Sequence, residues 1–107
     1  MSANLADKAT PDAFASPAHT ARRVATICNQ RGLHARAAAR FVKTAGQFDA
    51  EVLVRKNGTE VSGRSIMGLM MLAAAPGTVI ELAATGRQAE AAVTALIKLI
   101  ECKFDEE

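Results

Sequence analysis

The chain has 107 residues, which is enough for one compact domain and too few for two of ordinary size. Half of the residues are hydrophobic and 22% are charged, a balance typical of globular proteins rather than disordered or fibrous ones. The net charge of only +2 and the lack of Trp and Tyr argue against a nucleic-acid-binding role, because only four Phe are left to stack on bases.

Three regions are expected along the chain. The first 20 residues are rich in Ala, Ser, Thr, Asp and Pro without any periodicity, which predicts a flexible N-terminal extension. The folded domain is expected over residues 21–104, followed by a short acidic tail over residues 105–107. No apolar run is long enough for a signal sequence or for a membrane span, which requires about 18 apolar residues. A cytoplasmic protein is therefore expected.

The first half of the domain contains a predicted strand, a helix and a hairpin. The short β-branched run Arg23–Cys28 predicts the strand. Apolar residues then recur at helical spacing: Ala38, Phe41, Val42 and Ala45. Gly46 is expected to end this helix. Alternation over residues 50–55 predicts a second strand, and the Asn-Gly pair at 57–58 predicts a tight turn into the return strand Thr59–Ser62.

The second half is predicted as a helix, a strand and a longer helix. Ser65 begins the first of these helices, and Pro76 should stop it. Residues 78–84 alternate as a strand. Thr85 and Gln88 then have the spacing of a capping box. The last helix has one apolar stripe, which is expected to be buried: Ala89, Ala92, Val93, Leu96 and Ile100.

The predicted elements follow the order β-α-β-β-α-β-α. Strands joined by helices, with a hairpin in the middle, are typical of an α+β domain with two layers. We therefore expect one mostly antiparallel sheet covered on one face by helices.

The stretch GLHARAAARFV at residues 32–42 contains His34, one of only two histidines. A lone histidine near a helix start is more often a cap or a partly buried residue than a catalytic group. Here, however, Gly32 permits an unusual backbone, and the following helix offers free N–H groups and a positive dipole end that attract anions. Arg36 lies within reach of phosphate oxygens, and the positive surroundings disfavour the imidazolium form. These features favour a histidine that accepts a phosphoryl group.

Other chemistries find less support. A Ser-His-acid triad is not favoured, because the sequence contains no G-x-S-x-G motif. ATP binding through a P-loop is not favoured, because the sequence contains no Walker A motif. His34 has too few neighbouring ligands for a metal. Cys28 and Cys102 are too far apart in sequence for a zinc site and are expected as reduced, half-buried thiols. No metal or other cofactor is expected, so a phosphoryl acceptor of this kind must receive its group from another protein and pass it on.

The second predicted helix contains no charged residue. A helix that is apolar on all sides is either buried or covered by a partner, and a domain of this size can bury only one side. Leu69 and Leu72 are expected in the core. The other apolar side chains would then form an adaptable docking surface: Ile66, Met67, Met70 and Met71. The alternative is that these methionines fill irregular gaps in the core.

The stretch GLHARAAARFV, followed about thirty residues later by GRSIMGLMML, resembles HPr, the histidine-containing phosphocarrier family of the bacterial phosphoenolpyruvate-dependent phosphotransferase system. The resemblance covers about residues 22–103 and includes both signature stretches of the family. It implies an open-faced sandwich of four antiparallel strands with three helices on one side, in agreement with the order of elements derived above.

The resemblance also implies roles for individual residues. His34 matches the active-site histidine, which enzyme I phosphorylates on Nδ1, and Arg36 matches the arginine that stabilises the transferring group. Ser65 matches the serine that HPr kinase/phosphorylase modifies in organisms that have this enzyme. The surface that docks enzyme I and the A-type phosphotransferase proteins is matched by Ala39, Ile66, Met67 and Met70. The protein would then be a phosphocarrier with a transient phosphohistidine rather than an independent enzyme.

Two features depart from the family pattern. Most members have proline where this chain has Ala37, so the first turn of the helix is expected to be slightly looser while the chemistry is kept. The chain also runs past the common terminus of the family, so a terminal carboxylate near the histidine is not carried over. The stretch Asn29–Gly32 is similar to the nitrogen-related branch of the family, which often regulates rather than transports.

Two functional hypotheses remain open. The leading hypothesis is a phosphocarrier that uses His34. The alternative is a regulatory binding module controlled by phosphorylation of Ser65, which also suits the N-cap position of its helix. In either case we expect a monomer with protein partners and without nucleic acid or membrane binding.

Overall fold

A computed structural model of the chain describes residues 19–106. The elements follow the predicted order: β1 (Thr20–Thr26), α1 (Ala35–Ala45), β2 (Glu51–Lys56), β3 (Thr59–Ser62), α2 (Ile66–Met71), β4 (Val79–Thr85), α3 (Ala89–Glu101) and the 3₁₀ turn η2 (Lys103–Asp105). The expected N-terminal extension lies outside the described residues except for its last two, and Thr20 already belongs to β1.

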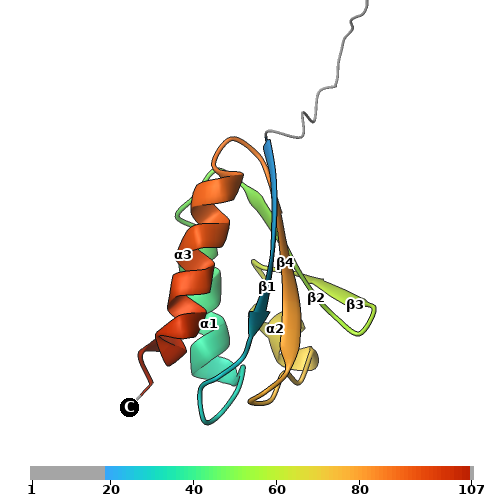
Figure 1. The fold of residues 1–107 in the computed structure, drawn as a ribbon, viewed down its shortest axis with the longest axis vertical. Helices are drawn as coiled ribbons and strands as arrows, with labels where there is room; N and C mark the ends of the chain where they lie inside the picture. The colour runs from blue at the N-terminus through green and yellow to red at the C-terminus, as the bar shows by residue number, and fades with distance from the viewer. Residues whose placement is uncertain (1–18, 107) are drawn as a thin grey trace, which may run out of the picture.

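The four strands form one antiparallel sheet in the order β1-β4-β2-β3. Helices α1 and α3 lie side by side along one face of this sheet, and the other face is open (Figure 1). The predicted α+β sandwich is therefore confirmed. In the central strand β4, the alternation of side chains places the predicted residues in the core: Ile80, Leu82 and Ala84.

The helices bury the predicted stripes against the sheet. All five apolar residues predicted for the core side of α3 are buried, and so are Ala38, Phe41 and Ala45 of α1. Gly46 ends α1 as expected, although its φ of −70° is ordinary helical geometry rather than a left-handed turn. The spacing of apolar residues thus predicted which side of each long helix faces the sheet.

The largest errors in the predicted element boundaries concern β1 and α2. Strand β1 begins at Thr20 rather than Arg23, because its pairing with β4 continues as far as Thr85. Helix α2 ends at Met71, well before Pro76, because the chain turns at Ala73, where φ is +52°. The Lys56 ammonium group stabilises this end by donating to the carbonyl oxygens of Leu72 and Ala73, at 2.8 and 3.2 Å. This long-range contact has no local signal in the sequence.

The predicted capping box of the third helix is also wrong. Thr85 is the last residue of β4, and Gln88 occupies the N-cap position without a side-chain bond to its own helix. Its Oε1 atom instead accepts the backbone N–H of Asp49 at 2.8 Å. The glutamine therefore ties the start of α3 to the segment before β2.

The cysteines are more exposed than expected. Cys28 and Cys102 are both free and exposed rather than half-buried, and the Cys28 thiol lies 3.4 Å from the carbonyl oxygen of Ile100. Within residues 19–106, no group of three His, Cys, Asp or Glu side chains is arranged to hold a metal ion. No helix in the same range is long and apolar enough to cross a membrane.

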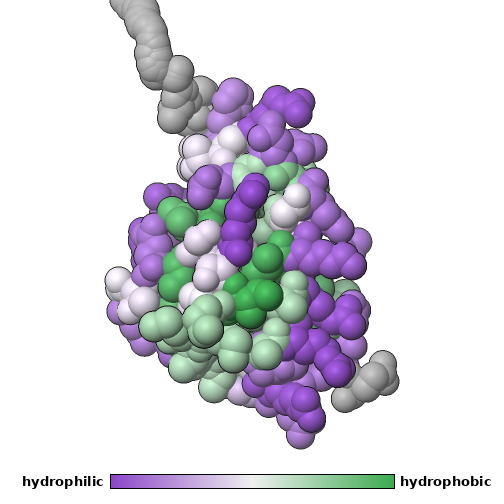
Figure 2. All heavy atoms as spheres, turned by 180° about the vertical axis from the view of Figure 1, so that it is seen from behind, coloured by the Kyte–Doolittle hydropathy of each residue, from purple (hydrophilic) through white to green (hydrophobic). Residues whose placement is uncertain are grey.

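Helix α2 presents an apolar surface that the fold leaves uncovered. Leu69 and Leu72 are buried, as predicted. The outward side carries the exposed residues that we call the α2 patch: Ile66, Met67, Met70 and Met71. Figure 2 shows an apolar area in the lower half of the molecule, where α2 lies, with hydrophilic side chains around it. Core filling therefore does not account for these methionines.

Candidate functional site

His34 is the N-cap residue of α1. Its backbone is extended, with φ −79° and ψ −177°, and its Nδ1 atom accepts the backbone N–H of Arg36 at 3.2 Å. The side chain is 25% exposed, so the ring is both held and accessible. A nitrogen that accepts a hydrogen bond carries a lone pair, which means that Nδ1 is the nucleophilic atom of the neutral ring.

The loop before His34 is fixed by backbone contacts. Gly32 has φ +68°, and a Cβ at this position would lie 2.5 Å from the carbonyl oxygen of Ala74, so only glycine fits. Leu33 donates its N–H to the same oxygen at 2.9 Å. Asn29 is fully buried and donates from Nδ2 to the Gly32 carbonyl oxygen at 2.7 Å. The predicted unusual backbone at Gly32 is thereby confirmed. This conformation places His34 at the start of α1.

Arg36 and His34 line a common hollow at the start of α1. Its volume is about 270 Å³, whereas a water molecule occupies about 30 Å³. A group of a few heavy atoms, such as a phosphoryl group, therefore fits in the hollow. Within residues 19–106, no carboxylate pairs with the Arg36 guanidinium, whereas Arg40 pairs with Asp105 at 3.5 Å. The first backbone N–H groups of α1 also lack intrahelical acceptors. The hollow therefore offers several donors to an anion.

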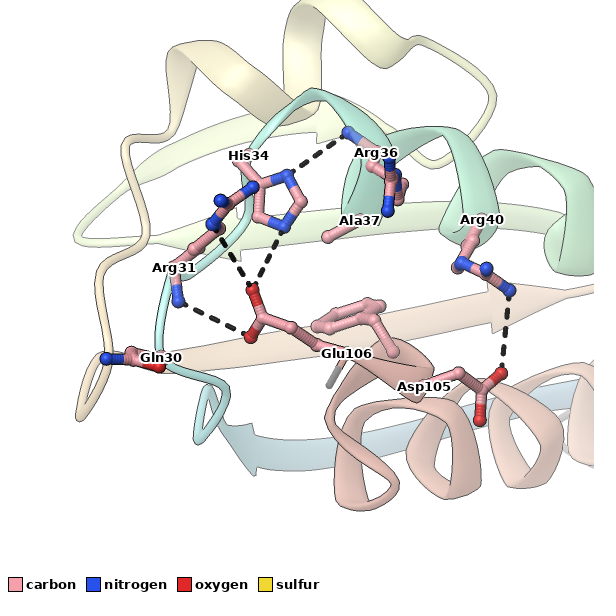
Figure 3. Close-up of a pocket in the computed structure, with 9 residues that line it drawn as sticks. Gln30, Arg31, His34, Arg36, Ala37, Arg40, Asp105 and Glu106 are labelled. Carbon is pink, nitrogen blue, oxygen red and sulfur yellow. Dashed lines mark hydrogen bonds and ion pairs between the residues drawn. The ribbon is translucent and has the colours of Figure 1, made fainter.

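Sequence reasoning missed Glu106, which lies beside the histidine. Its Oε2 atom is 3.5 Å from His34 Nε2 and 3.9 Å from Arg31 Nε, and its Oε1 atom accepts the Arg31 backbone N–H at 3.5 Å (Figure 3). A carboxylate near the ring was not expected, because the end of the chain departs from the family pattern. Phe104, an apolar residue just past α3, is the sequence feature that could have indicated this contact. It is buried in the core, so the chain turns back and Glu106 lies near α1.

The Glu106 carboxyl group has a pKa below its usual value of 4.5. Burial is the largest single influence and raises the pKa. It is outweighed by the Asn29 side chain, the Arg31 backbone N–H, the nearby His34 ring and the Gln30 backbone, which all favour the ionised form. The carboxylate is therefore charged at neutral pH.

This lowered pKa leads to a prediction about acid stability. A folded-state pKa below the unfolded one gives stability that is present above about pH 4.5 and is lost as the pH falls through the folded-state pKa. We therefore expect wild type to lose more unfolding free energy than Glu106→Gln between about pH 5 and about pH 3. Urea unfolding at both pH values measures this loss. Equal losses in the two proteins would contradict the prediction.

Ser65 is the N-cap residue of α2, as predicted. Its Oγ atom accepts the backbone N–H of Gly68 at 2.9 Å. The hydroxyl group is partly exposed and adjoins the α2 patch at Ile66 and Met67. Because α1 and α2 pack against one another, the fold holds the helices that begin with His34 and Ser65 in fixed relation.

The family is decided by comparison with known proteins. A family model described as "PTS HPr component phosphorylation site" matches residues 21–102. The chain belongs to the HPr family. It is 56% identical over 80 residues to the phosphocarrier protein HPr of Neisseria meningitidis, which covers 75% of this chain and 90% of that protein. It is also 43% identical over 84 residues to the phosphocarrier protein NPr of Shewanella violacea, with coverage of 78% and 92%.

Solved structures agree with this assignment. The crystal structure of HPr-C-His from Thermoanaerobacter tengcongensis matches with a TM-score of 0.78 at 45% identity, covering 81% of this chain and 98% of that one. The resemblance of the sequence to HPr and the predicted fold are both confirmed. HPr is the phosphocarrier of the phosphotransferase system, so the partners of this family, as a class, are proteins of that system.

The remaining HPr positions named from the sequence lie on α1 and α2. Ala39 is exposed on α1, and the α2 patch supplies the other predicted docking residues. Ala37, where the resemblance to the family implies proline, is 1% exposed and lines the hollow beside His34. Its backbone N–H belongs to the first turn of α1, so alanine supplies one donor there that proline would lack.

In this HPr chain, the Ser65 cap is expected to contribute measurably to stability. Ser65→Ala removes the acceptor of the Gly68 N–H and should lower the unfolding free energy by about 1 kcal/mol. Chemical denaturation measures this change. Ser65→Asn, which keeps an N-cap acceptor, should recover most of the loss. A Ser65→Ala protein as stable as wild type would show that the cap has no energetic role.

Proposed function

We propose that the chain carries phosphoryl groups on His34. Nδ1 would accept the group from enzyme I, which takes it from phosphoenolpyruvate, and would then donate it to A-type phosphotransferase proteins. One observation carries the proposal: His34 Nδ1 accepts the Arg36 N–H at the start of α1, beside an Arg36 guanidinium that pairs with no carboxylate within residues 19–106. The nucleophilic atom, Nδ1, therefore lies at the anion site formed by the start of α1.

The transfer follows from this geometry. The Nδ1 lone pair attacks phosphorus, the new N–P bond forms, and the donor's P–N bond breaks with its electron pair returning to the donor. The Arg36 N–H that now bonds to Nδ1 is released and can donate to a phosphoryl oxygen instead. The guanidinium of the same residue and the positive end of the α1 dipole stabilise the charge of the transferring group. No nucleotide or metal cofactor takes part.

The partners would dock on the α2 patch together with Ala39. Methionine side chains adapt to surfaces of different shape, which suits a carrier that meets a donor and several acceptors in turn. We further propose a cytoplasmic monomer, as expected from the sequence. Similarity to both HPr and NPr relatives leaves sugar uptake and nitrogen regulation as the two candidate branches.

Incubation with purified enzyme I and labelled phosphoenolpyruvate tests the proposal. Label that is lost in acid and kept in base identifies a phosphohistidine, and the ³¹P and ¹⁵N shifts of the product assign the modified nitrogen. We expect label on Nδ1 of His34 and its transfer to an A-type protein. A wild-type protein that takes up no such label would refute the phosphocarrier function.

The second candidate function is regulation through Ser65. The observation that favours it is the position of the hydroxyl group, at the start of α2 and at the edge of the α2 patch. A phosphate there is compatible with the helix dipole but brings nearly two negative charges to an apolar docking surface. The fold should persist while partner binding weakens.

A pair of aspartate variants tests this candidate. Ser65→Asp should bind enzyme I more weakly than wild type, by about tenfold, because it adds charge next to the patch. Ser62→Asp is the matched control, since Ser62 lies at the end of β3 and its hydroxyl oxygen accepts the nearby Arg64 N–H rather than an N–H of α2. Affinities measured by calorimetry decide the outcome. Equal binding by Ser65→Asp and wild type would remove support for the regulatory function.

A further inference from the structure

We propose that Lys56 is a positioning residue for phosphoryl transfer: its ammonium group fixes the segment after α2, and this segment places both the α2 patch and the loop over residues 29–33 that leads to His34. The proposal rests on the proposed function, since it concerns how the patch and the acceptor are presented to a partner. Lys56 is the last residue of β2, immediately before the tight turn at residues 57–58. It acts through contacts across the fold.

The Lys56 ammonium group binds the backbone at the end of α2. Nζ donates to the carbonyl oxygen of Leu72 at 2.8 Å and to that of Ala73 at 3.2 Å. The last carbonyl groups of a helix lack intrahelical partners, and a cation suits the negative end of the helix dipole. Within residues 19–106, no carboxylate pairs with Lys56 and draws the ammonium group away. The side chain therefore caps the last turn of α2.

Helix α2 needs such a contact because it is short. It has only six residues, with Ser65 as its N-cap and no basic residue in its own last turn. A helix of this length has little stability of its own in water. Met70 and Met71, two residues of the α2 patch, lie at its C-terminal end. Lys56 therefore fixes the part of the patch that is farthest from the Ser65 cap.

The same lysine holds an unusual backbone conformation just beyond α2. Ala73 has φ +52°, a region that residues other than glycine rarely adopt. A residue keeps such a conformation only where surrounding contacts hold it. The carbonyl groups of Leu72 and Ala73 belong to the two peptide groups that flank the Ala73 Cα atom, and Lys56 binds both. The ammonium group therefore fixes the turn itself.

The turn at Ala73 determines where Ala74 lies, and Ala74 contacts the loop before His34. Ala74 is buried, and its carbonyl oxygen accepts the Leu33 N–H at 2.9 Å. Gly32 packs so closely on this segment that an added Cβ would lie 2.5 Å from the same oxygen. A displaced Ala74 would therefore shift the loop, and with it His34.

Two substitutions of Lys56 and one control test the proposal. Lys56→Met keeps an unbranched side chain and removes the donors. Lys56→Arg keeps a charged group that can donate to two acceptors, and it should restore most of the wild-type behaviour. Lys98→Met is the matched control, because Lys98 is an exposed residue of α3 that pairs with no carboxylate within residues 19–106. Urea unfolding of each variant checks that the fold persists.

Amide hydrogen exchange of the unphosphorylated protein measures the effect of Lys56 on the backbone. The Ala73 N–H bonds to the Met70 carbonyl oxygen at 3.0 Å, and the Leu33 N–H bonds to that of Ala74. In Lys56→Met we expect both N–H groups to exchange about fivefold faster than in wild type, because the segment between them opens more often. The N–H of Leu96, in the buried stripe of α3, reports global unfolding and should change less.

Initial rates with enzyme I and labelled phosphoenolpyruvate measure the effect on transfer. With this protein as the varied substrate, Lys56→Met should have a kcat/KM about fivefold lower than wild type, because the patch and the histidine are less well placed. Lys56→Arg and Lys98→Met should both stay within about twofold of wild type.

The outcomes separate this role from the proposed function. If wild type accepts label and Lys56→Met has the wild-type kcat/KM, the positioning role is overturned and the phosphocarrier function stands. Unchanged exchange at Leu33 in Lys56→Met would overturn the link to the histidine. A loss of rate in Lys98→Met as large as in Lys56→Met would also count against the role, because positive charge alone would then account for it. If wild type accepts no label, the proposed function fails, and the role of Lys56 in transfer fails with it.

Discussion

Replacing His34 by alanine should abolish phosphoryl acceptance. The variant loses Nδ1, and Arg36, which lines the same hollow, has no nucleophilic atom because its guanidinium stays protonated. With enzyme I and labelled phosphoenolpyruvate, we expect no acid-labile, base-stable label on His34→Ala. The loss should not reflect unfolding, because the ring is partly exposed and its removal costs one helix cap, about 1 kcal/mol.

The second histidine provides the matched control. His19 is exposed, lies before β1 and contributes its backbone carbonyl group to a bond with the Gly86 N–H, which alanine retains. His19→Ala should therefore accept label like wild type. Label retained by His34→Ala, or lost from His19→Ala, would place the acceptor elsewhere.

The largest effect on stability is expected for Gly32→Ala. A Cβ at this position lies 2.5 Å from the Ala74 carbonyl oxygen, a backbone atom that cannot move aside independently, and φ is +68°. Strain and displacement together should lower the unfolding free energy by about 3 kcal/mol. Because the displaced loop carries His34, phosphoryl acceptance should fall in the same variant even where it remains folded. Urea denaturation and label uptake measure the two effects.

Gly58→Ala separates the clash from the backbone strain. Gly58 has φ +83°, but a Cβ there meets nothing within 4 Å. This variant should lose only about 1 kcal/mol and keep full phosphoryl acceptance, since the 57–58 turn does not line the hollow beside His34. Equal destabilisation by the two substitutions would show that the contact between Gly32 and Ala74 has no cost of its own.

Most of the fold was predictable because its long elements have strong periodicity. The stripe on α3 and the alternation in β4 each identified buried residues correctly, since a helix or a strand that covers one core has only one apolar side. The errors occurred at ends. The stop of α2 depends on Lys56 and the start of α3 on Asp49, two partners that are distant in sequence, so local patterns did not indicate them.

The candidate site was predictable only where its residues are close in sequence. His34, Arg36 and Gly32 belong to one stretch, so their spacing on a loop and a helix start already suggested an anion site. Glu106 comes from the opposite end of the chain. Its approach to the ring depends on the burial of Phe104 and on three residues in a left-handed turn, and no sequence period encodes that conformation.

The carbonyl oxygen of Ala74 links the two functional stretches of the molecule. Leu33, next to His34, donates to it at 2.9 Å, and Ala74 lies three residues after the end of α2. The histidine and the α2 patch are thus parts of one rigid body. A protein that binds the patch meets an acceptor atom already at a fixed place and orders no flexible loop to reach it. Each encounter therefore avoids most of the entropic cost of alignment, which suits a carrier that must bind briefly, react and leave.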